Sequence, residues 1–141
     1  MANIQSLFDE NLTFERRVEK VITFSNREPK VLRNEARDYV LTDNLSSEYE
    51  TLLNYFDDAQ SGDGSPECCT WLSGFYGSGK SSFAKYFGLS FDSKTEVEGQ
   101  PFHELFTARF ESATLKSRIK TLTKKYDTAV FLLDLAAQGV A

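Results

Sequence analysis

The sequence has few residues of the types that build disulfide frameworks or metal centres. Its 141 residues include two cysteines, adjacent at Cys68 and Cys69, and one histidine, His103. Two cysteines are too few for a disulfide framework, and neighbouring cysteines rarely pair with each other. We therefore expect Cys68 and Cys69 to be reduced and buried in a strand, as in a cytoplasmic protein. No metal-ligand spacing surrounds His103, so we expect no structural metal site there.

Long apolar runs and an excess of positive charge are also missing. The chain has no run of about 18 apolar residues and no leader-like start, so we expect neither membrane spanning nor export. The formal net charge of −5 argues against a broad basic surface for nucleic acid. Hydrophobic residues make up 40% of the chain, with 12 Phe and 6 Tyr, which predicts a packed core in a chain of one-domain size.

A polar stretch, "QSGDGSPE", divides the chain by composition. Residues 1–60 before it predict a short β element followed by mostly helical sequence, and residues 61–66 are loop. Residues 67–141 predict the start of a P-loop NTPase core. The loop is either a domain boundary or a surface loop within one compact unit, and the chain length favours the second reading.

Apolar periodicity predicts the elements on each side of this loop. The strands are expected in "RRVEKVITF", in "CCTWLSG" and in "DTAVFLLDL", the last two buried. Helices are expected from Lys30, in the segment capped by Ser46 or Ser47, and over 80–91, 101–110 and 112–126. The predicted fold class is therefore α/β: a partial P-loop core in the order strand, P-loop, helix, helix, strand.

Residues 74–81, "GFYGSGKS", match the P-loop pattern G-x-x-x-x-G-K-[ST] between an apolar run and an amphipathic segment. Glycines at 74, 77 and 79 let the backbone curve and aim its N–H groups inward at an anion. Lys80 is expected on the β- and γ-phosphates and Ser81 on Mg²⁺, with Ser82 nearest the α-phosphate. The predicted nucleotide-binding set is Gly74, Phe75, Tyr76, Gly77, Ser78, Gly79, Lys80, Ser81 and Ser82.

Hydrolysis needs an acidic residue at the end of a neighbouring strand as well as Lys80. Asp134 follows four apolar residues in "VFLLDL" and is the candidate. Two readings remain open from the residues alone. Asp134 either holds Mg²⁺ through water or only ends the second strand of the sheet.

The residues on both sides of the motif indicate one family among the P-loop proteins. "WLSGFYGSGKSSFAKYFG" resembles the P-loop region of the large ATPase of BREX phage-defence systems, known as BrxC, and its counterpart PglY. "ARDYVLTDNLSSEYETLLNYFDDA" upstream and "ATLKSRIKTLTKKYDTAVFLLDLAAQG" downstream extend the likeness over roughly residues 30–139. Ser82 stands where that family often has His, so no role of that His carries over.

This resemblance implies ATP and Mg²⁺ as ligands and an ATPase activity in a chain longer than this one. It implies self-association and contact with other defence-system proteins. Because "FLLDL" matches the family's second strand, it also favours an acidic Mg²⁺ residue beyond the end of this sequence over Asp134. Tyr39, Val40 and Thr42 become candidates for contacting adenine, although a core role at a helix end is favoured for Tyr39 and Val40.

Two other functions are compatible with the motif. One is a nucleoside or small-molecule kinase, although only Arg109 and Arg118 follow the loop as candidates to reach a phosphate. The other is a non-hydrolysing module in which nucleotide controls assembly. The basic stretch "KSRIKTLTKKY" is interpreted as a solvated helix face rather than a DNA-contacting surface.

Overall fold

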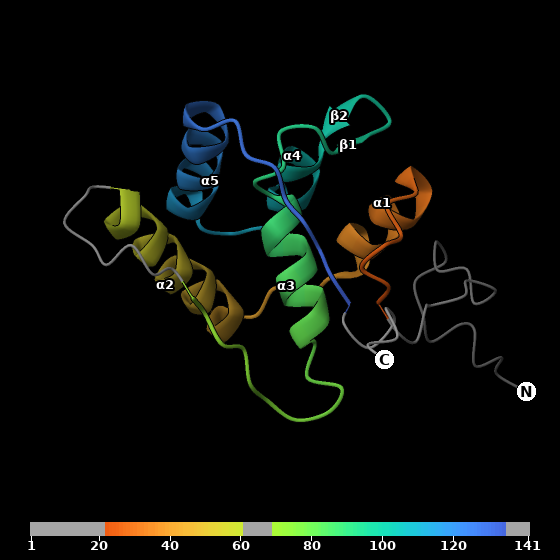
Figure 1. The fold of residues 1–141 in the computed structure, drawn as a ribbon, viewed down its shortest axis with the longest axis horizontal. Coiled ribbons are helices and arrows are strands. Elements are labelled where there is room, and N and C mark those ends of the chain that lie inside the picture. Colours follow the sequence, from red (N-terminus) through yellow and green to blue (C-terminus); the bar gives the residue numbers. More distant parts are fainter. Residues whose placement is uncertain (1–21, 61–68, 135–141) are drawn as a thin grey trace, which may run out of the picture.

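The computed structural model describes residues 22–60 and 69–134. This part of the chain forms five α-helices and one short hairpin (Figure 1). The elements are α1 (Pro29–Asp38), α2 (Asp43–Gln60), α3 (Lys80–Leu89), β1 (Glu96–Val97), β2 (Gln100–Pro101), α4 (Phe102–Thr107) and α5 (Ala113–Lys125). None of these helices is long and apolar enough to cross a membrane. The strand predicted in "RRVEKVITF" lies mostly outside the described residues, as do Cys68 and the 61–66 loop.

An aromatic cluster around α3 forms the core, and helices from both sides of the 61–66 loop contribute to it. Tyr49 of α2 lies at its centre, with ring centroids 4.5 Å from Phe83 and 5.4 Å from Phe87. Phe106 of α4 and Phe110 close the other side of Tyr49 at 6.0 and 5.7 Å. Offset and edge-to-face rings at these separations stabilise a core beyond simple area burial.

The prediction that α3 packs one apolar side is confirmed, because Phe83, Tyr86 and Phe87 are all buried. The prediction for α5 is also confirmed: Leu115 and Ile119 are buried one turn apart. Ser112 caps this helix, since its hydroxyl accepts a hydrogen bond from the N–H of Leu115 at 3.2 Å. This is the usual arrangement at a helix N-terminus.

Helix α2 begins earlier than predicted. It starts at Asp43, and the hydroxyl of Thr42 accepts a hydrogen bond from the N–H of Leu45 at 3.3 Å. The predicted caps Ser46 and Ser47 therefore lie inside the helix. Thr42 satisfies one of the N–H groups that the first turn leaves without a partner.

A buried lysine joins α3 to α1 and to the chain before it. The side chain of Lys85 is 0% exposed, and its ammonium lies 2.8 Å from Glu35 Oε2. It also donates a hydrogen bond of 3.0 Å to the carbonyl of Thr23. Because an ammonium buried without a partner is very costly, these contacts hold three segments in one arrangement.

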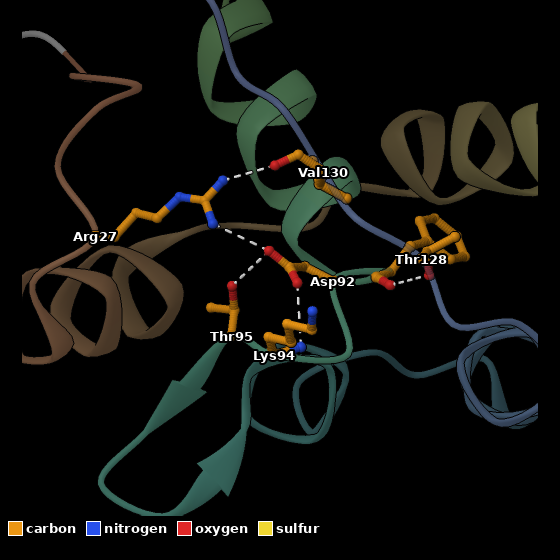
Figure 2. A network of polar contacts seen from close by, with 7 residues as sticks. Arg27, Asp92, Lys94, Thr95, Thr128 and Val130 are labelled. Carbon is orange, nitrogen blue, oxygen red and sulfur yellow. Dashed lines mark hydrogen bonds and ion pairs between the residues drawn. The ribbon is translucent and has the colours of Figure 1, made fainter.

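A second polar network fixes the C-terminal end of α3 (Figure 2). Arg27 donates to the buried carboxylate of Asp92 at 3.0 Å and to the carbonyl of Val130 at 2.8 Å. The Asp92 carboxylate also accepts hydrogen bonds from the Thr95 hydroxyl and the Lys94 N–H. Arg27 and Asp92 together therefore connect the segment before α1, the loop after α3 and the chain after α5.

Residues 126–134 are extended but lie outside any sheet of the described residues. They run back along α3, with Thr128 donating to the Phe91 carbonyl and Val130 packed against Gly88. Alternate residues face away, leaving Phe131 83% and Leu133 67% exposed. The prediction of a strand buried on both faces is thus wrong, because only one face of this segment meets the helix.

The segment before the P-loop is also more open than predicted. Residues 69–73 form no strand among the described residues, and Trp71 is 89% exposed. Cys69 is an exposed free thiol, so its predicted burial is wrong. An apolar run becomes a buried strand only where neighbouring strands cover it, and such a neighbour is missing from the described part of the chain. The complete α/β core therefore stays a prediction.

Apart from Pro101, the hairpin β1–β2 lies between the helices expected over 80–91 and 101–110, in residues for which the sequence pattern predicts no element. Val97 pairs with Gln100 across a turn in which Glu98 and Gly99 have φ of 53° and 80°. Two positive φ values in succession are the geometry of a tight hairpin turn. Pro101 ends β2 and caps α4 instead of lying in its first turn.

The buried ion pair gives a stability prediction. Lys85→Met or Glu35→Gln each leaves one buried group without its partner, so each is expected to lower the free energy of unfolding by about 3 kcal/mol. Urea unfolding followed by circular dichroism measures the loss. The exposed Lys94 gives the matched control, Lys94→Met, with an expected change within about 0.5 kcal/mol.

The double variant Lys85→Met/Glu35→Gln is expected to lose less than the sum of the two single losses, because no uncompensated buried charge remains. Strictly additive losses, or single losses as small as that of the control, would contradict the role given to this pair.

Candidate functional site

The P-loop motif of residues 74–81 leads directly into α3. Its last two residues, Lys80 and Ser81, are the first two residues of that helix. Gly77 and Gly79 have φ of 79° and 84°, a conformation that side-chain-bearing residues rarely adopt. The N–H of Ser78 donates to the carbonyl of Phe75 at 3.2 Å, which closes a tight turn within the loop. Two of the three glycines predicted to curve the backbone, Gly77 and Gly79, therefore occupy positions where the curvature requires glycine.

The ammonium of Lys80 lies against the loop. It donates to the carbonyls of Gly74 at 2.9 Å and Phe75 at 2.7 Å. A third, longer contact of 3.5 Å joins it to the hydroxyl of Ser78. The positive charge is thus held at the inner side of the turn, six residues from the start of the motif.

The N-terminus of α3 meets the same turn. Gly79 is its N-cap and supplies no side-chain cap, so the first N–H groups of the helix lack a side-chain acceptor. The first intrahelical bond runs from the N–H of Phe83 to the carbonyl of Gly79 at 2.9 Å. Free N–H groups and the helix dipole make such an end suited to anions.

The remaining residues of the motif are solvent-facing. Ser81 is exposed in the first turn of α3, and Ser82 is partly buried. The rings of Phe75 and Tyr76 are exposed and stand away from the core. The structure therefore brings Gly74, Phe75 and Ser78 together around Lys80 through backbone and hydroxyl atoms, and leaves the hydroxyl of Ser81 accessible.

A cleft of about 520 Å³ adjoins the loop. Its lining comes from α2, from the chain leading into the P-loop and from the first turn of α3. The residues that line it are Tyr39, Leu45, Glu48, Thr51, Leu52, Tyr55, Thr70, Trp71, Leu72, Ser73, Ser78, Gly79, Lys80 and Phe83. Its size is that of an ordinary small-molecule site.

Sequence reasoning missed the α2 wall of this cleft. Leu45, Glu48, Leu52 and Tyr55 recur at steps of three and four residues, so they share one face of the helix. The sequence therefore shows that these four residues share a face of the helix. Which face of α2 meets the P-loop depended on packing against α3, and the sequence does not give it.

The three candidates for adenine contact separate in the structure. Tyr39 lines the cleft, with its ring 4.9 Å from that of Tyr86 in an edge-to-face pair. Val40 is an exposed side chain outside the cleft lining, and Thr42 is the cap of α2. Burial raises the pKa of the Tyr39 hydroxyl, which has no hydrogen-bond partner of normal geometry among the described residues.

Asp134 lies at the end of the extended segment that runs back along α3. The order of its contacts, Phe91 with Thr128 and then Gly88 with Val130, directs this segment toward the P-loop end of the helix. Figure 1 shows the same course. Asp134 is exposed at that end.

The described residues contain no group of three or more His, Cys, Asp and Glu that could hold a metal ion by themselves. His103 lies on α4, away from the P-loop, beside a separate groove with Lys116 and Lys120. A cation at the P-loop would therefore need ligands from a bound phosphate in addition to Ser81.

The loop geometry predicts an asymmetry between two substitutions at Gly79. A Cβ at this position meets no atom within 4 Å, so the cost is in the backbone alone. Gly79→Ala is expected to lower the free energy of unfolding by about 1 kcal/mol, as a left-handed conformation costs an L-residue. Gly79→Asn should lose less, because Asn tolerates this region. Thermal unfolding of both variants tests this, and equal losses would contradict it.

Searches of protein-family models, of curated proteins and of solved structures found no match to this chain. The functional argument therefore rests on the residues and geometry of the P-loop and its cleft.

Proposed function

We propose that this chain binds a nucleoside triphosphate, with ATP as the expected ligand, through residues 74–82. The observation that carries the proposal is the position of the Lys80 ammonium, held by the Gly74 and Phe75 carbonyls beside the free N-terminus of α3. A localised positive charge next to unpaired N–H groups is the combination that a polyphosphate requires.

The two strong carbonyl contacts of Lys80 differ from its third contact. The 3.5 Å approach to the Ser78 hydroxyl is long for a hydrogen bond, and a phosphate oxygen competes with it at little cost. Lys80 can then keep both carbonyl contacts while its third proton donates to the β- or γ-phosphate. The N–H groups of Gly77 and of Gly79 to Ser82 donate to the same phosphates, whereas the N–H of Ser78 stays bonded to the Phe75 carbonyl.

Mg²⁺ fits the site as a partner of the nucleotide. A hydroxyl and phosphate oxygens are the hard ligands that this ion prefers, and the exposed hydroxyl of Ser81 lies in the first turn of α3. The ion would neutralise charge on the transferred phosphoryl group. Lys80 supplies the remaining positive charge.

The cleft beside the loop gives the nucleoside a place to lie. Tyr39 forms part of its wall, and the ring of Tyr55 is 60% exposed on the face of α2 that borders it. Aromatic rings at such an opening can stack on a base, which every nucleobase permits through its π face. Tyr39 is therefore kept as a candidate for base contact, whereas Val40 and Thr42 are not.

We further propose that hydrolysis occurs in a chain longer than this one, in a cytoplasmic ATPase of a BREX-type defence system. This rests on the resemblance around the P-loop. The acidic residue on the Mg²⁺ side then follows residue 141, and Asp134 is the weaker candidate. Self-association and contact with other defence proteins belong to the same proposal.

Exposed apolar side chains favour a second function, nucleotide-controlled assembly without hydrolysis. Trp71 precedes the P-loop, and Phe131 and Leu133 lie on the open face of the extended segment beside α3. Large apolar side chains exposed on extended segments without a neighbouring strand are typical of surfaces that another protein chain covers on assembly. Nucleotide at the P-loop could then control that covering. Binding without turnover by the longer chain of the first proposal would favour this function, because both functions predict no turnover by residues 1–141 alone.

Removing the Lys80 ammonium tests the proposal directly. Lys80→Ala is expected to weaken binding of both ATP and inorganic tripolyphosphate at least tenfold, about 1.4 kcal/mol or more, because the charge lies against the phosphates. Isothermal titration calorimetry with each ligand measures this.

Lys94→Ala removes the same charge from an exposed site outside the loop and is the matched control. Equal affinity of wild type and Lys80→Ala for tripolyphosphate would refute the P-loop assignment. If Lys80→Ala lowers the affinity for ATP alone, Lys80 contacts the nucleoside and not the phosphates.

A further inference from the structure

Helix α5 has an unusual charge balance for an acidic chain. Residues 112–126 carry five cations, Lys116, Arg118, Lys120, Lys124 and Lys125, and no carboxylate. The whole protein has a net charge of −5. Positive charge is therefore concentrated on this helix, and the question is which of these charges are already compensated.

Two of the five cations interact with Asp57 of α2. Arg118 donates to the carboxylate of Asp57 at 2.6 Å. The ammonium of Lys125 lies 4.9 Å from the centre of the Tyr126 ring, and Asp57 acts on it electrostatically. Both charges thus have partners within the described structure.

The other three cations lie on the side of α4, where Lys116 makes one long contact of 3.5 Å with the carbonyl of Ala108 and none is ion-paired with a carboxylate of the described residues. Lys116, Lys120 and Lys124 recur at four-residue steps, which sets their Cα atoms about 6 Å apart along one side of the helix. Lys116 and Lys120 line a groove of about 420 Å³ between α4 and α5, together with Ser117 and His103. Glu104 is the one carboxylate in the lining of that groove.

The charges in this groove act on His103. Burial lowers the pKa of its imidazole, and Lys120 and Lys124 lower it further against the opposing effect of Glu104. Both lysines are therefore close enough for His103 to experience their charge. A neutral imidazole at pH 7 adds hydrogen-bonding capacity to the groove without adding charge.

The chemistry of this face distinguishes between classes of partner. None of the large exposed apolar side chains of the described residues belongs to α4 or α5. Protein interfaces usually have an apolar or aromatic centre, which this face lacks. Phosphate contacts need only spaced cations and small donors, both of which are present.

We propose that Lys116, Lys120 and Lys124, with Ser117 beside them, bind the phosphate backbone of a nucleic acid strand. This proposal is independent of nucleotide binding at the P-loop. The sequence alone favoured a solvated helix face here, because it does not show that Arg118 and Lys125 are the compensated cations. The three lysines that remain form a continuous row.

Binding of a short fluorescein-labelled DNA duplex, followed by anisotropy across a salt series, tests the proposal. Three phosphate contacts predict a loss in affinity of about 40-fold between about 50 and 200 mM salt. For Lys120→Ala/Lys124→Ala the expected loss over the same range falls to about fourfold, since one contact remains. Glu104→Gln should tighten binding, because it removes the carboxylate from the groove.

Lys30→Ala/Lys94→Ala removes two exposed lysines outside α5 and is the matched control, with the same change in net charge. It is expected to keep the affinity and the salt dependence of the wild type. The proposal is overturned if the wild type shows no saturable binding at about 50 mM salt. It is also overturned if the control loses as much affinity as Lys120→Ala/Lys124→Ala.

Discussion

The position of α3, and with it the P-loop, depends on a charge buried in the core. Lys85 lies on α3 one and a half turns after Lys80, and its ammonium contacts Glu35 of α1 and the Thr23 carbonyl. Removing an ammonium from water is tolerated only where the partners stay in place. The helix that presents the P-loop at one end is therefore fixed along its length by an interaction that permits little displacement.

The local geometry of the loop follows from this anchoring and from its glycines. Gly77 and Gly79 adopt left-handed conformations, and Lys80 is held by two loop carbonyls. None of these contacts involves a neighbouring strand. The loop proposed to bind phosphate can therefore form while the chain before it, including Trp71, remains exposed.

The difference between local contacts and contacts with distant segments explains what could be predicted from the sequence. The glycine turn of the P-loop, the apolar side of α3 and the buried Leu115 and Ile119 of α5 depend on residues close in sequence, so the residue pattern was sufficient to predict them. Burial of residues 69–73 and 126–134 depends on partners far along the chain or outside it, because a strand is covered only by its neighbours. Local apolar runs gave no information about those partners.

The candidate site divides in the same way. The roles proposed for Lys80 and Ser81 rest on their spacing in the sequence, whereas the α2 wall with Glu48 and Tyr55 depends on how α2 packs against α3. Thr42 shows the opposite failure, since a candidate for ligand contact proved to be a helix cap. Only the packed structure separates a polar residue that serves the fold from one that is available to a ligand.

The central claim is that backbone N–H groups between Gly77 and Ser82, other than that of Ser78, donate hydrogen bonds to the phosphates of a nucleotide. Titration of ¹⁵N-labelled protein with ATP, followed by amide chemical shifts, tests it most directly. The account predicts saturable shifts of these amides, while those of the β1–β2 hairpin stay unchanged. Saturable binding of ATP that leaves the Gly77–Ser82 amides unmoved would contradict it.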